Sequence, residues 1–314
     1  MRLIERWPSE IDLHRRFAPM HRVPKSAILT AMRDLNQRLT SILGQEPRLS
    51  PLGGGCVGEV YRADLPDGRR VVIKVDSSDH AVLDKEGWML RYLAEHSALP
   101  VPKVLHNAPD LLVMSFLPGH SDFDAQAEAH AAQLLADLHT RSASAYGLEQ
   151  DTLIGGLHQP NPWTESWLDF FRDQRLLFMG RVAHDAGHLP ASTLARIEKL
   201  AGRLDRWMEE PPAPALIHGD VWSANVLAKT GRITGFVDPA IYYADPEIEL
   251  AFITLFHTFG DAFFHRYDEL FGIRPGFWEA RRHLYNLYPL LVHVRLFGGG
   301  YVDSVKRTLT RFGA

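Results

Sequence analysis

The stretch His218-Gly-Asp-Val-Trp-Ser-Ala-Asn225, followed by Asp238-Pro239, guides the interpretation of the whole chain. Residues 225–237, which lie between them, have the composition of two short strands, and Gly231 suits a tight hairpin turn. Asn225 and Asp238 would then stand at opposite ends of one hairpin. We therefore expect both side chains to reach the same edge of the structure.

An acid, an amide and a second acid in this order suit a site that activates a hydroxyl group beside metal-bound phosphates. Because the transferred group is anionic, such a site needs a divalent metal held by oxygen ligands and one carboxylate that receives the substrate proton. Asp220 is the candidate catalytic base, and Asn225 and Asp238 are the candidate metal ligands. Alternatively, either Asp could be a solvated turn residue, because a His-Gly-Asp tripeptide alone is a weak signal.

Composition and charge narrow the class of protein. The chain has 314 residues, of which 46% are hydrophobic and 23% charged, as in a soluble globular protein, and its length allows two domains or two lobes. Its net charge is -4, and no Lys/Arg run is sustained, so we expect neither nucleic acid nor a membrane as partner. Residues 1–8 lack a secretory signal pattern, which predicts a cytoplasmic protein. One cysteine excludes an internal disulfide and a Cys-based zinc cluster.

A glycine-rich segment, Leu52-Gly-Gly-Gly-Cys-Val-Gly-Glu-Val-Tyr61, is flanked by strand-forming residues and is not followed by a helix pattern. This context favours a kinase-type lid over phosphates and disfavours a dinucleotide-binding turn, which opens a helix. A purely structural turn remains an alternative. The candidate ATP-binding residues here are Gly53, Gly54, Gly55, Cys56 and Gly58.

Lys74 is the one charge inside a predicted strand, residues 70–75, and should neutralise phosphate if an acid orients it. Glu86 is the candidate acid, because it lies on the inward stripe of a helix predicted over residues 81–95. The alternative is a solvated glutamate on a charged helix.

The strands predicted at residues 99–105 and 110–117 end at a Pro-Gly break, which places a lobe boundary near Ser115 to Gly119. The pattern predicts a two-lobed, protein-kinase-like α+β fold. Residues 1–115 would form an N-lobe with an antiparallel sheet and a helix at residues 25–43, and residues 116–314 a mainly helical C-lobe. Connector residues would offer backbone groups to an adenine edge, which makes Ser115, Phe116 and Leu117 nucleotide-binding candidates by position.

Helical patterns dominate the predicted C-lobe. They cover residues 124–141 and 190–209, with His139 read as a packing residue in preference to a catalytic one. Asn161-Pro-Trp163 resembles an N-cap followed by a first-turn proline. Pro289 predicts a kink and Gly298 a helix end.

Several stretches together resemble the fructosamine kinases (ketosamine 3-kinases), within the aminoglycoside-phosphotransferase-like kinases. They run from about residue 50 to the C-terminus and include Gly53-Gly-Gly-Cys56, Ala136-Asp-Leu-His139, Gln159-Pro-Asn-Pro-Trp163, His218 to Asn225, Asp238-Pro-Ala-Ile-Tyr-Tyr243 and Leu284-Tyr-Asn-Leu-Tyr288. The resemblance implies ATP and Mg²⁺ as cofactors and transfer to the sugar 3-hydroxyl of a ketosamine. Its carrier would be a small amine or a glycated lysine on a protein. The resemblance also implies that the ketosamine 3-phosphate is unstable and releases the sugar from the amine, so the implied activity is deglycation.

The chain departs from related kinases at several positions. Pro239 stands where a typical protein kinase has Phe, so a mobile Phe switch is not expected. After the paired tyrosines the family often has Gly-His before an Arg or Pro and a Glu, whereas this chain has Ala244-Asp-Pro-Glu247. The added acid, Asp245, could bind a cationic amine of the substrate or cap the following helix. The family's Asp-Leu-Ala appears as Glu249-Leu-Ala251. Trp222 could form a wall for the sugar or pack in the core.

Cys56 leaves the oligomeric state open. A thiolate in a phosphate lid would permit reversible oxidation or a disulfide between two chains, whereas a buried thiol would be inert. We therefore expect a monomer or a redox-sensitive dimer. Two other functions also stay open: a kinase of an aminoglycoside or choline-like alcohol, and a nucleotide-binding scaffold without turnover.

Overall fold

The computed structural model describes residues 25–52 and 58–314, with side chains from residue 33 onward in those ranges. The chain divides into two compact units. The first comprises Met1–Arg48 and Asp64–Arg69, and the second comprises Leu49–Ala63 and Arg70–Ala314. The lobe boundary between residues 115 and 116 stays a prediction.

The first unit contains the helix α1 (Lys25–Leu43), over the range that the sequence predicts. Gly44, at φ +75°, follows the helix, and its N–H donates to Thr40 O at 2.9 Å. The Asp67 carboxylate accepts from Gln45 Nε2 at 3.0 Å and from Arg69 Nε at 2.7 Å. These contacts tie the turn at residues 64–69 to the end of the helix.

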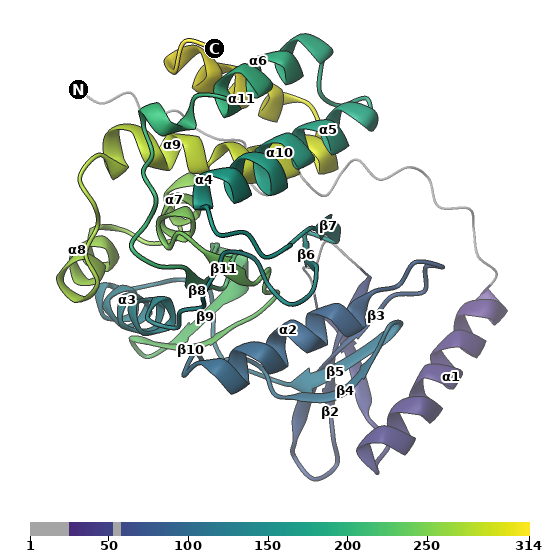
Figure 1. Cartoon of the computed structure of the whole chain (residues 1–314). Coiled ribbons are helices and arrows are strands. Elements are labelled where there is room, and N and C mark those ends of the chain that lie inside the picture. Colours follow the sequence, from purple (N-terminus) through teal and green to yellow (C-terminus); the bar gives the residue numbers. More distant parts are fainter. Residues whose placement is uncertain (1–24, 53–57) are drawn as a thin grey trace. The chain divides into compact units, whose positions relative to one another are not determined.

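The second unit begins with a five-stranded sheet in the order β1-β2-β3-β5-β4. Its strands are β1 (Arg48–Pro51), β2 (Glu59–Asp64), β3 (Arg70–Val75), β4 (Val104–Ala108) and β5 (Leu111–Ser115). The helix α2 (Leu83–His96) lies across the sheet (Figure 1). Leu83, Leu90 and Leu93 are buried on its inner face, as the apolar stripe predicts.

Strand β4 starts five residues later than expected, at Val104 in place of Leu99. Pro100 and Pro102 have no backbone N–H to donate to a ladder, so the strand begins only beyond them. Strand β3 pairs antiparallel with β5, and Lys74 stands opposite Leu112.

The remainder of the second unit is mainly helical. Its longer helices are α3 (Ala125–His139), α5 (Phe178–Asp185), α6 (Ala191–Ala201), α7 (Glu247–Phe256), α8 (Asp261–Leu270), α10 (Leu287–Phe297) and α11 (Gly300–Arg311). Its short helices are α4 (Trp167–Phe170), two π-helical turns (Phe171–Leu177 and Phe277–Arg281), two 3-10 turns (Leu204–Arg206 and Ser223–Asn225) and α9 (Arg282–Tyr285). A sheet followed by helices confirms the predicted α+β fold class.

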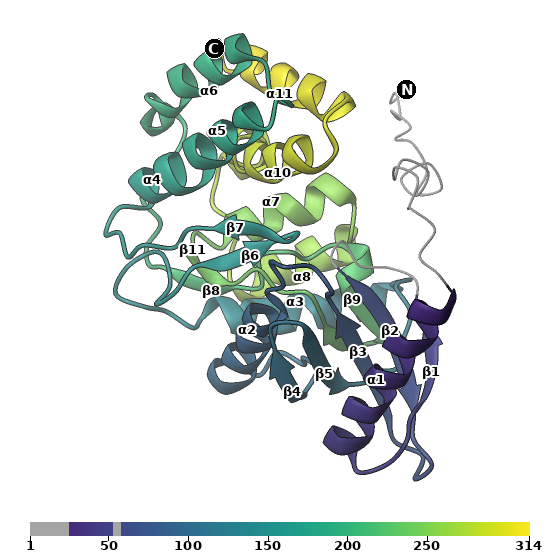
Figure 2. The same ribbon diagram turned by 90° about the vertical axis from the view of Figure 1, so that its right-hand side faces the viewer.

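Three pairs of short antiparallel strands are set into this helical part. They are β6 (Thr152–Ile154) with β7 (Leu157–Gln159), β8 (Ala215–Ile217) with β11 (Tyr242–Ala244), and β9 (Val226–Lys229) with β10 (Arg232–Phe236). In Figure 2, β8 and β11 lie between the large sheet and the upper layer of helices α4 to α6, α10 and α11. The β9–β10 hairpin confirms the prediction, with its turn at Thr230 and Gly231 in the left-handed region, at φ 50° and 71°.

One local prediction was wrong. The helix expected from Pro162 begins at Trp167, where the Ser166 hydroxyl caps it by accepting from the Asp169 N–H at 3.2 Å. Asn161 is instead buried, with its Oδ1 accepting from Arg175 at 2.6 Å. Near Pro289 the helix is interrupted: α9 ends at Tyr285 and α10 starts at Leu287, so Pro289 lies in the first turn of α10. The kink at Pro289 stays a prediction.

None of the helices in the described part of the chain has the length and apolar character needed to span a bilayer.

Candidate active site

Lys74 joins three elements of the second unit. Its Nζ lies 2.8 Å from Glu86 Oε1 on α2 and 2.5 Å from Asp238 Oδ1, just after β10. The lysine is 7% exposed. The expectation that Glu86 orients Lys74 therefore agrees with the geometry, and Asp238, from far along the chain, contacts the same lysine.

Two carboxylates share this one lysine. Burial alone would lower the pKa of Lys74, but Asp238 and Glu86 outweigh it and raise that pKa. Burial raises the pKa of Glu86 to about 7, against the charge of Lys74 and with help from the negative charge of Asp238. The cluster has one more acid than base, which suits a further cation beside Asp238.

Asp220 and Asn225 face each other in the loop after β8. Asn225 Nδ2 donates to Asp220 Oδ2 at 2.8 Å and to Asp220 O at 3.0 Å. Burial raises the pKa of Asp220 to about 8, with help from the charge of Asp238 and against the hydrogen bond from Asn225. Since the amide nitrogen of Asn225 is turned to Asp220, its amide oxygen is left for another partner.

Backbone contacts hold the two loops of the site together. The Val237 N–H donates to Asn225 O at 2.9 Å, and the Ala240 N–H donates to His218 O at 2.8 Å. Asp238 has a left-handed backbone, at φ 54°. A Cβ on Gly219, at φ 85°, would lie 2.2 Å from Ala240 O, so only glycine fits there without movement.

A buried series of hydrogen-bonded side chains contacts the loop that carries Gly219 and Asp220. The Gly219 N–H donates to Glu249 Oε1 at 2.6 Å, and Glu249 Oε2 is 2.9 Å from His139 Nε2. His139 Nδ1 in turn is 2.6 Å from Tyr267 Oη. Burial opposes ionisation of Glu249, yet the hydrogen bond and charge of His139 lower its pKa overall.

This series of side chains was missed from the sequence. His139 was interpreted as a packing residue and Glu249 as a mild change in a motif, and each is buried as a packing residue should be. What pairs them is the packing of α3, α7 and α8. The available signal was two polar residues on otherwise apolar helix faces.

The glycine-rich candidates are only partly described. Gly53, Gly54, Gly55 and Cys56 lie outside the described residues. Gly58 has φ 73°, and a Cβ there would lie 2.3 Å from Val75 O at the end of β3. A glycine is therefore needed at position 58, where two backbone segments approach closely, and the role of Gly58 toward phosphate stays a prediction.

The connector candidates differ in what they have left to offer. The Ser115 N–H donates to Lys103 O at 2.9 Å, and the Phe116 N–H donates to Arg70 O at 3.2 Å. Within the described part of the chain, the Leu117 N–H has no such partner. Leu117 is thus the connector residue whose N–H is available to a ligand.

The two substrate-binding candidates lie in different surroundings. Trp222 is half-buried, with its ring centroid 6.0 Å from that of Phe256. Asp245 is fully buried, accepts from Tyr285 Oη at 2.6 Å, pairs with Arg274 and accepts from the Glu247 N–H at 3.0 Å. These contacts favour the helix-cap interpretation of Asp245 over contact with a substrate amine.

The donor set of the site fits magnesium. The Asn225 amide oxygen and the Asp238 carboxylate are hard oxygen ligands, and Mg²⁺ typically takes one or two of these together with phosphate and water. Among the described residues, no group of three or more His, Cys, Asp or Glu side chains is arranged to hold a metal ion. A metal here would therefore need the oxygens of a bound phosphate.

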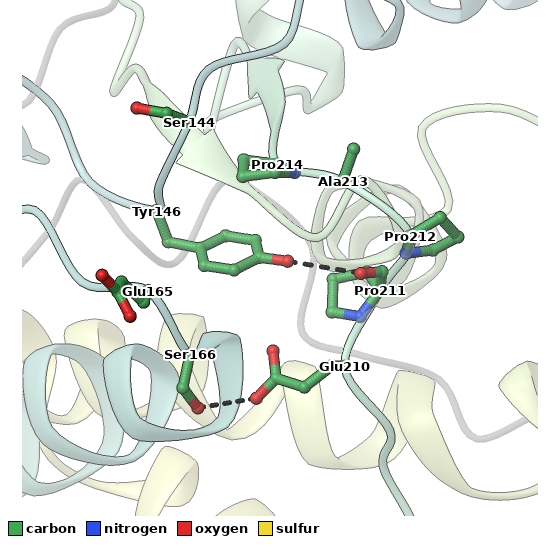
Figure 3. A pocket seen from close by; sticks show the side chains of 9 residues that line it. All are labelled: Ser144, Tyr146, Glu165, Ser166, Glu210, Pro211, Pro212, Ala213 and Pro214. Carbon is green, nitrogen blue, oxygen red and sulfur yellow. Dashed lines mark hydrogen bonds between the residues drawn. The ribbon is translucent and has the colours of Figure 1, made fainter.

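An open cavity of about 400 Å³ lies elsewhere in the helical part (Figure 3). It is lined by Ser144, Tyr146, Glu165, Ser166, Glu210 and Pro211 to Pro214. The Glu210 carboxylate there accepts from Ser166 Oγ at 2.6 Å and so braces the start of α4. With two acids and no basic residue in its lining, this cavity is unsuited to phosphate.

Comparison with known proteins identifies the family of the chain. The family model described as fructosamine kinase matches residues 31–313. A probable ketoamine kinase of Synechocystis sp. is 34% identical over 287 residues, which cover 87% of this chain and 94% of that protein. A chloroplastic protein-ribulosamine 3-kinase of Arabidopsis thaliana is 29% identical, over 83% of this chain and 81% of that protein.

Solved structures show the same relationship. A Thermobifida fusca protein that carries the provisional name fructosamine-3-kinase superposes with a TM-score of 0.78 at 31% identity, over 88% of this chain and 98% of that chain. An aminoglycoside phosphotransferase superposes with a TM-score of 0.63 at 20% identity, over 89% and 96%, and shows a shared kinase-like fold. The chain therefore belongs to the fructosamine kinase family and is a phosphotransferase.

Proposed function

We propose that the protein transfers the γ-phosphoryl group of ATP to the sugar 3-hydroxyl of a ketosamine, with Mg²⁺ as the metal. The observation that carries the proposal is a pair of contacts, Lys74 with Asp238 and Asn225 with Asp220. The backbone hydrogen bond from the Val237 N–H to Asn225 O ties the two loops that carry them. Relatives named for ketoamine and ribulosamine kinase activity support a fructosamine or ribulosamine adduct as the acceptor.

Asp220 acts as the base in this proposal. The Asn225 amide holds Asp220 Oδ2, so in the ionised carboxylate, which prevails above the raised pKa of about 8, the other oxygen accepts the hydroxyl proton. As the sugar oxygen bonds to the γ-phosphorus, the bond from that phosphorus to the bridging oxygen of ADP breaks and the proton passes to Asp220. Positioning is the main contribution of Asn225, because a fixed carboxylate needs no reorientation.

Lys74 neutralises the nucleotide phosphates, and its contact with Glu86 fixes its direction. The Asn225 amide oxygen and the Asp238 carboxylate hold the magnesium ion, which offsets phosphate charge when bound. On the connector, the Leu117 N–H is the donor available to the adenine edge. Gly58 and the rest of the glycine-rich segment would cover the phosphates.

The test is ATP consumption with ribulosamine, erythrulosamine and fructosamine adducts, compared with a reaction that lacks an acceptor. We expect ADP release to depend on an adduct and on Mg²⁺. The variant Asp220→Asn should keep its affinity for an ATP analogue and lose most transfer, since only the proton acceptor is removed. Undiminished turnover by this variant would contradict the assigned role of Asp220.

Deglycation is the proposed consequence of the transfer. After phosphorylation, the free amine and the sugar product can be followed over time by mass spectrometry. We expect the amine to appear only when ATP is present. A 3-phosphate that keeps its amine would restrict the function to phosphorylation.

A further inference from the structure

Six aromatic side chains form a continuous strip that starts beside the proposed base. The aromatic strip consists of Trp222, Phe252, Phe256, His293, Phe297 and Tyr301. The Trp222 and Phe256 ring centroids are 6.0 Å apart, and those of Phe256 and His293 are 5.2 Å apart. His293 continues to Tyr301 at 4.9 Å and to Phe297 at 5.6 Å.

The strip runs from the catalytic loop to the surface. Trp222 is two residues from Asp220, and Phe297, at the other end, is 47% exposed. Helix α10 ends at Phe297, and the left-handed Gly298 and Gly299 turn the chain into α11. This turn sets Tyr301 against His293, so the outer end of the strip is built from two helices.

No member of the strip is permanently charged. His293 Nδ1 is 2.8 Å from the Pro289 carbonyl oxygen and donates to it, and burial lowers the pKa of His293, which disfavours its charged form. Phe252 and Phe256 pack at 5.0 Å beneath it. An apolar strip of this kind stabilises a ligand through buried area and ring contacts.

We propose that the aromatic strip binds the substituent on the ketosamine nitrogen and favours aromatic amines over small ones. This inference rests on the proposed function. In a ketosamine, the nitrogen is bonded to C1, two carbons from the C3 that carries the reacting hydroxyl. With that hydroxyl at Asp220, the substituent is attached a few bonds away, near Trp222, and the strip leads from there to the exposed Phe297.

The test compares kcat/KM for N-benzyl and N-methyl adducts made from both fructose and ribulose. One or two ring contacts should raise kcat/KM for the benzyl adduct roughly three- to tenfold over the methyl adduct. Phe297→Ala and Tyr301→Ala should each reduce this ratio toward one, while turnover of the methyl adduct is kept. Phe297→Leu, which retains apolar area without the ring, should give an intermediate ratio.

Trp278→Ala is the matched control, because Trp278 is an exposed aromatic residue, at 40% exposure, that is not part of the strip. The control should leave the benzyl-to-methyl ratio unchanged. Two outcomes overturn this inference and leave the proposed function intact. One is an equal kcat/KM for the two adducts in the unaltered protein, and the other is a benzyl preference that persists in the double variant Phe297→Ala, Tyr301→Ala. Absence of turnover with every adduct overturns the proposed function as well.

Discussion

Glu249 is predicted to position the catalytic loop, and Glu249→Gln tests this with little change in side-chain size. The Glu249 carboxylate accepts one hydrogen bond from Gly219 and one from His139. Bonds to a charged group contribute about 1.5 to 3 kcal/mol and neutral ones about 0.5 to 1.5 kcal/mol, so the substitution should cost about 1 kcal/mol for each bond.

The expected result is a Tm that falls by roughly 4 to 8 °C for about 2 kcal/mol in total. In addition, kcat should fall about tenfold if the weakened Gly219 contact displaces Asp220 by about 1 Å or less. The affinity for an ATP analogue should stay unchanged, because Lys74 and Asp238 do not contact Glu249. Differential scanning fluorimetry, steady-state kinetics and nucleotide titration measure the three quantities.

Glu210→Gln is the control for a purely structural effect. Glu210 also accepts from backbone N–H groups, those of Trp167 at 2.7 Å and Leu168 at 3.2 Å, but at the start of α4. The Glu210→Gln substitution should lower Tm without lowering kcat. If Glu249→Gln keeps full kcat, or if both variants lose kcat equally, Glu249 has no positioning role.

Other changes probe the same site. Lys74→Met should weaken nucleotide binding at least tenfold, because Glu86 and Asp238 lose their shared cation; titration with an ATP analogue measures it, and an unchanged Kd would remove Lys74 from the phosphate site. Gly219→Ala should lower both Tm and kcat, because its Cβ meets a backbone carbonyl at 2.2 Å, and a variant with native Tm would show that the loop yields. The folded-state pKa of Glu249 lies below its ordinary 4.5, so its contribution to stability is present above pH 4.5 and is lost as pH falls through the lower folded value. The Tm difference between the unaltered protein and Glu249→Gln should therefore narrow in acid.

Local patterns predicted the elements that carry the site. The β9–β10 hairpin and the helix α2 follow from turn glycines and apolar spacing, which act over a few residues. Lys74 stood out because a charge inside an apolar strand needs a partner. Local signals therefore identified Glu86, Asn225 and Asp238 without knowledge of the packing.

Other features could not be predicted in this way. Asn161 has the sequence pattern of a helix cap, but Arg175 is buried without a carboxylate contact among the described residues and takes the Asn161 amide oxygen instead. The strand predicted at residues 99–105 was misplaced, because Pro100 and Pro102 cannot donate to a strand ladder although the residues around them are apolar. In each case, a hydrogen-bonding requirement overrode a local preference.

The sequence alone determined the type of chemistry. Two acids, an amide and a lysine at the spacings of this chain suit phosphoryl transfer and few other reactions. Only the tertiary structure decided how the loop that carries Asp220 is held and which aromatic side chains lie in one strip beside it. His139 and Glu249 are 110 residues apart, and the aromatic strip joins a loop to three helices. Contacts between such distant residues depend on how helices pack, and the spacing of residues along one segment carries no information about that packing.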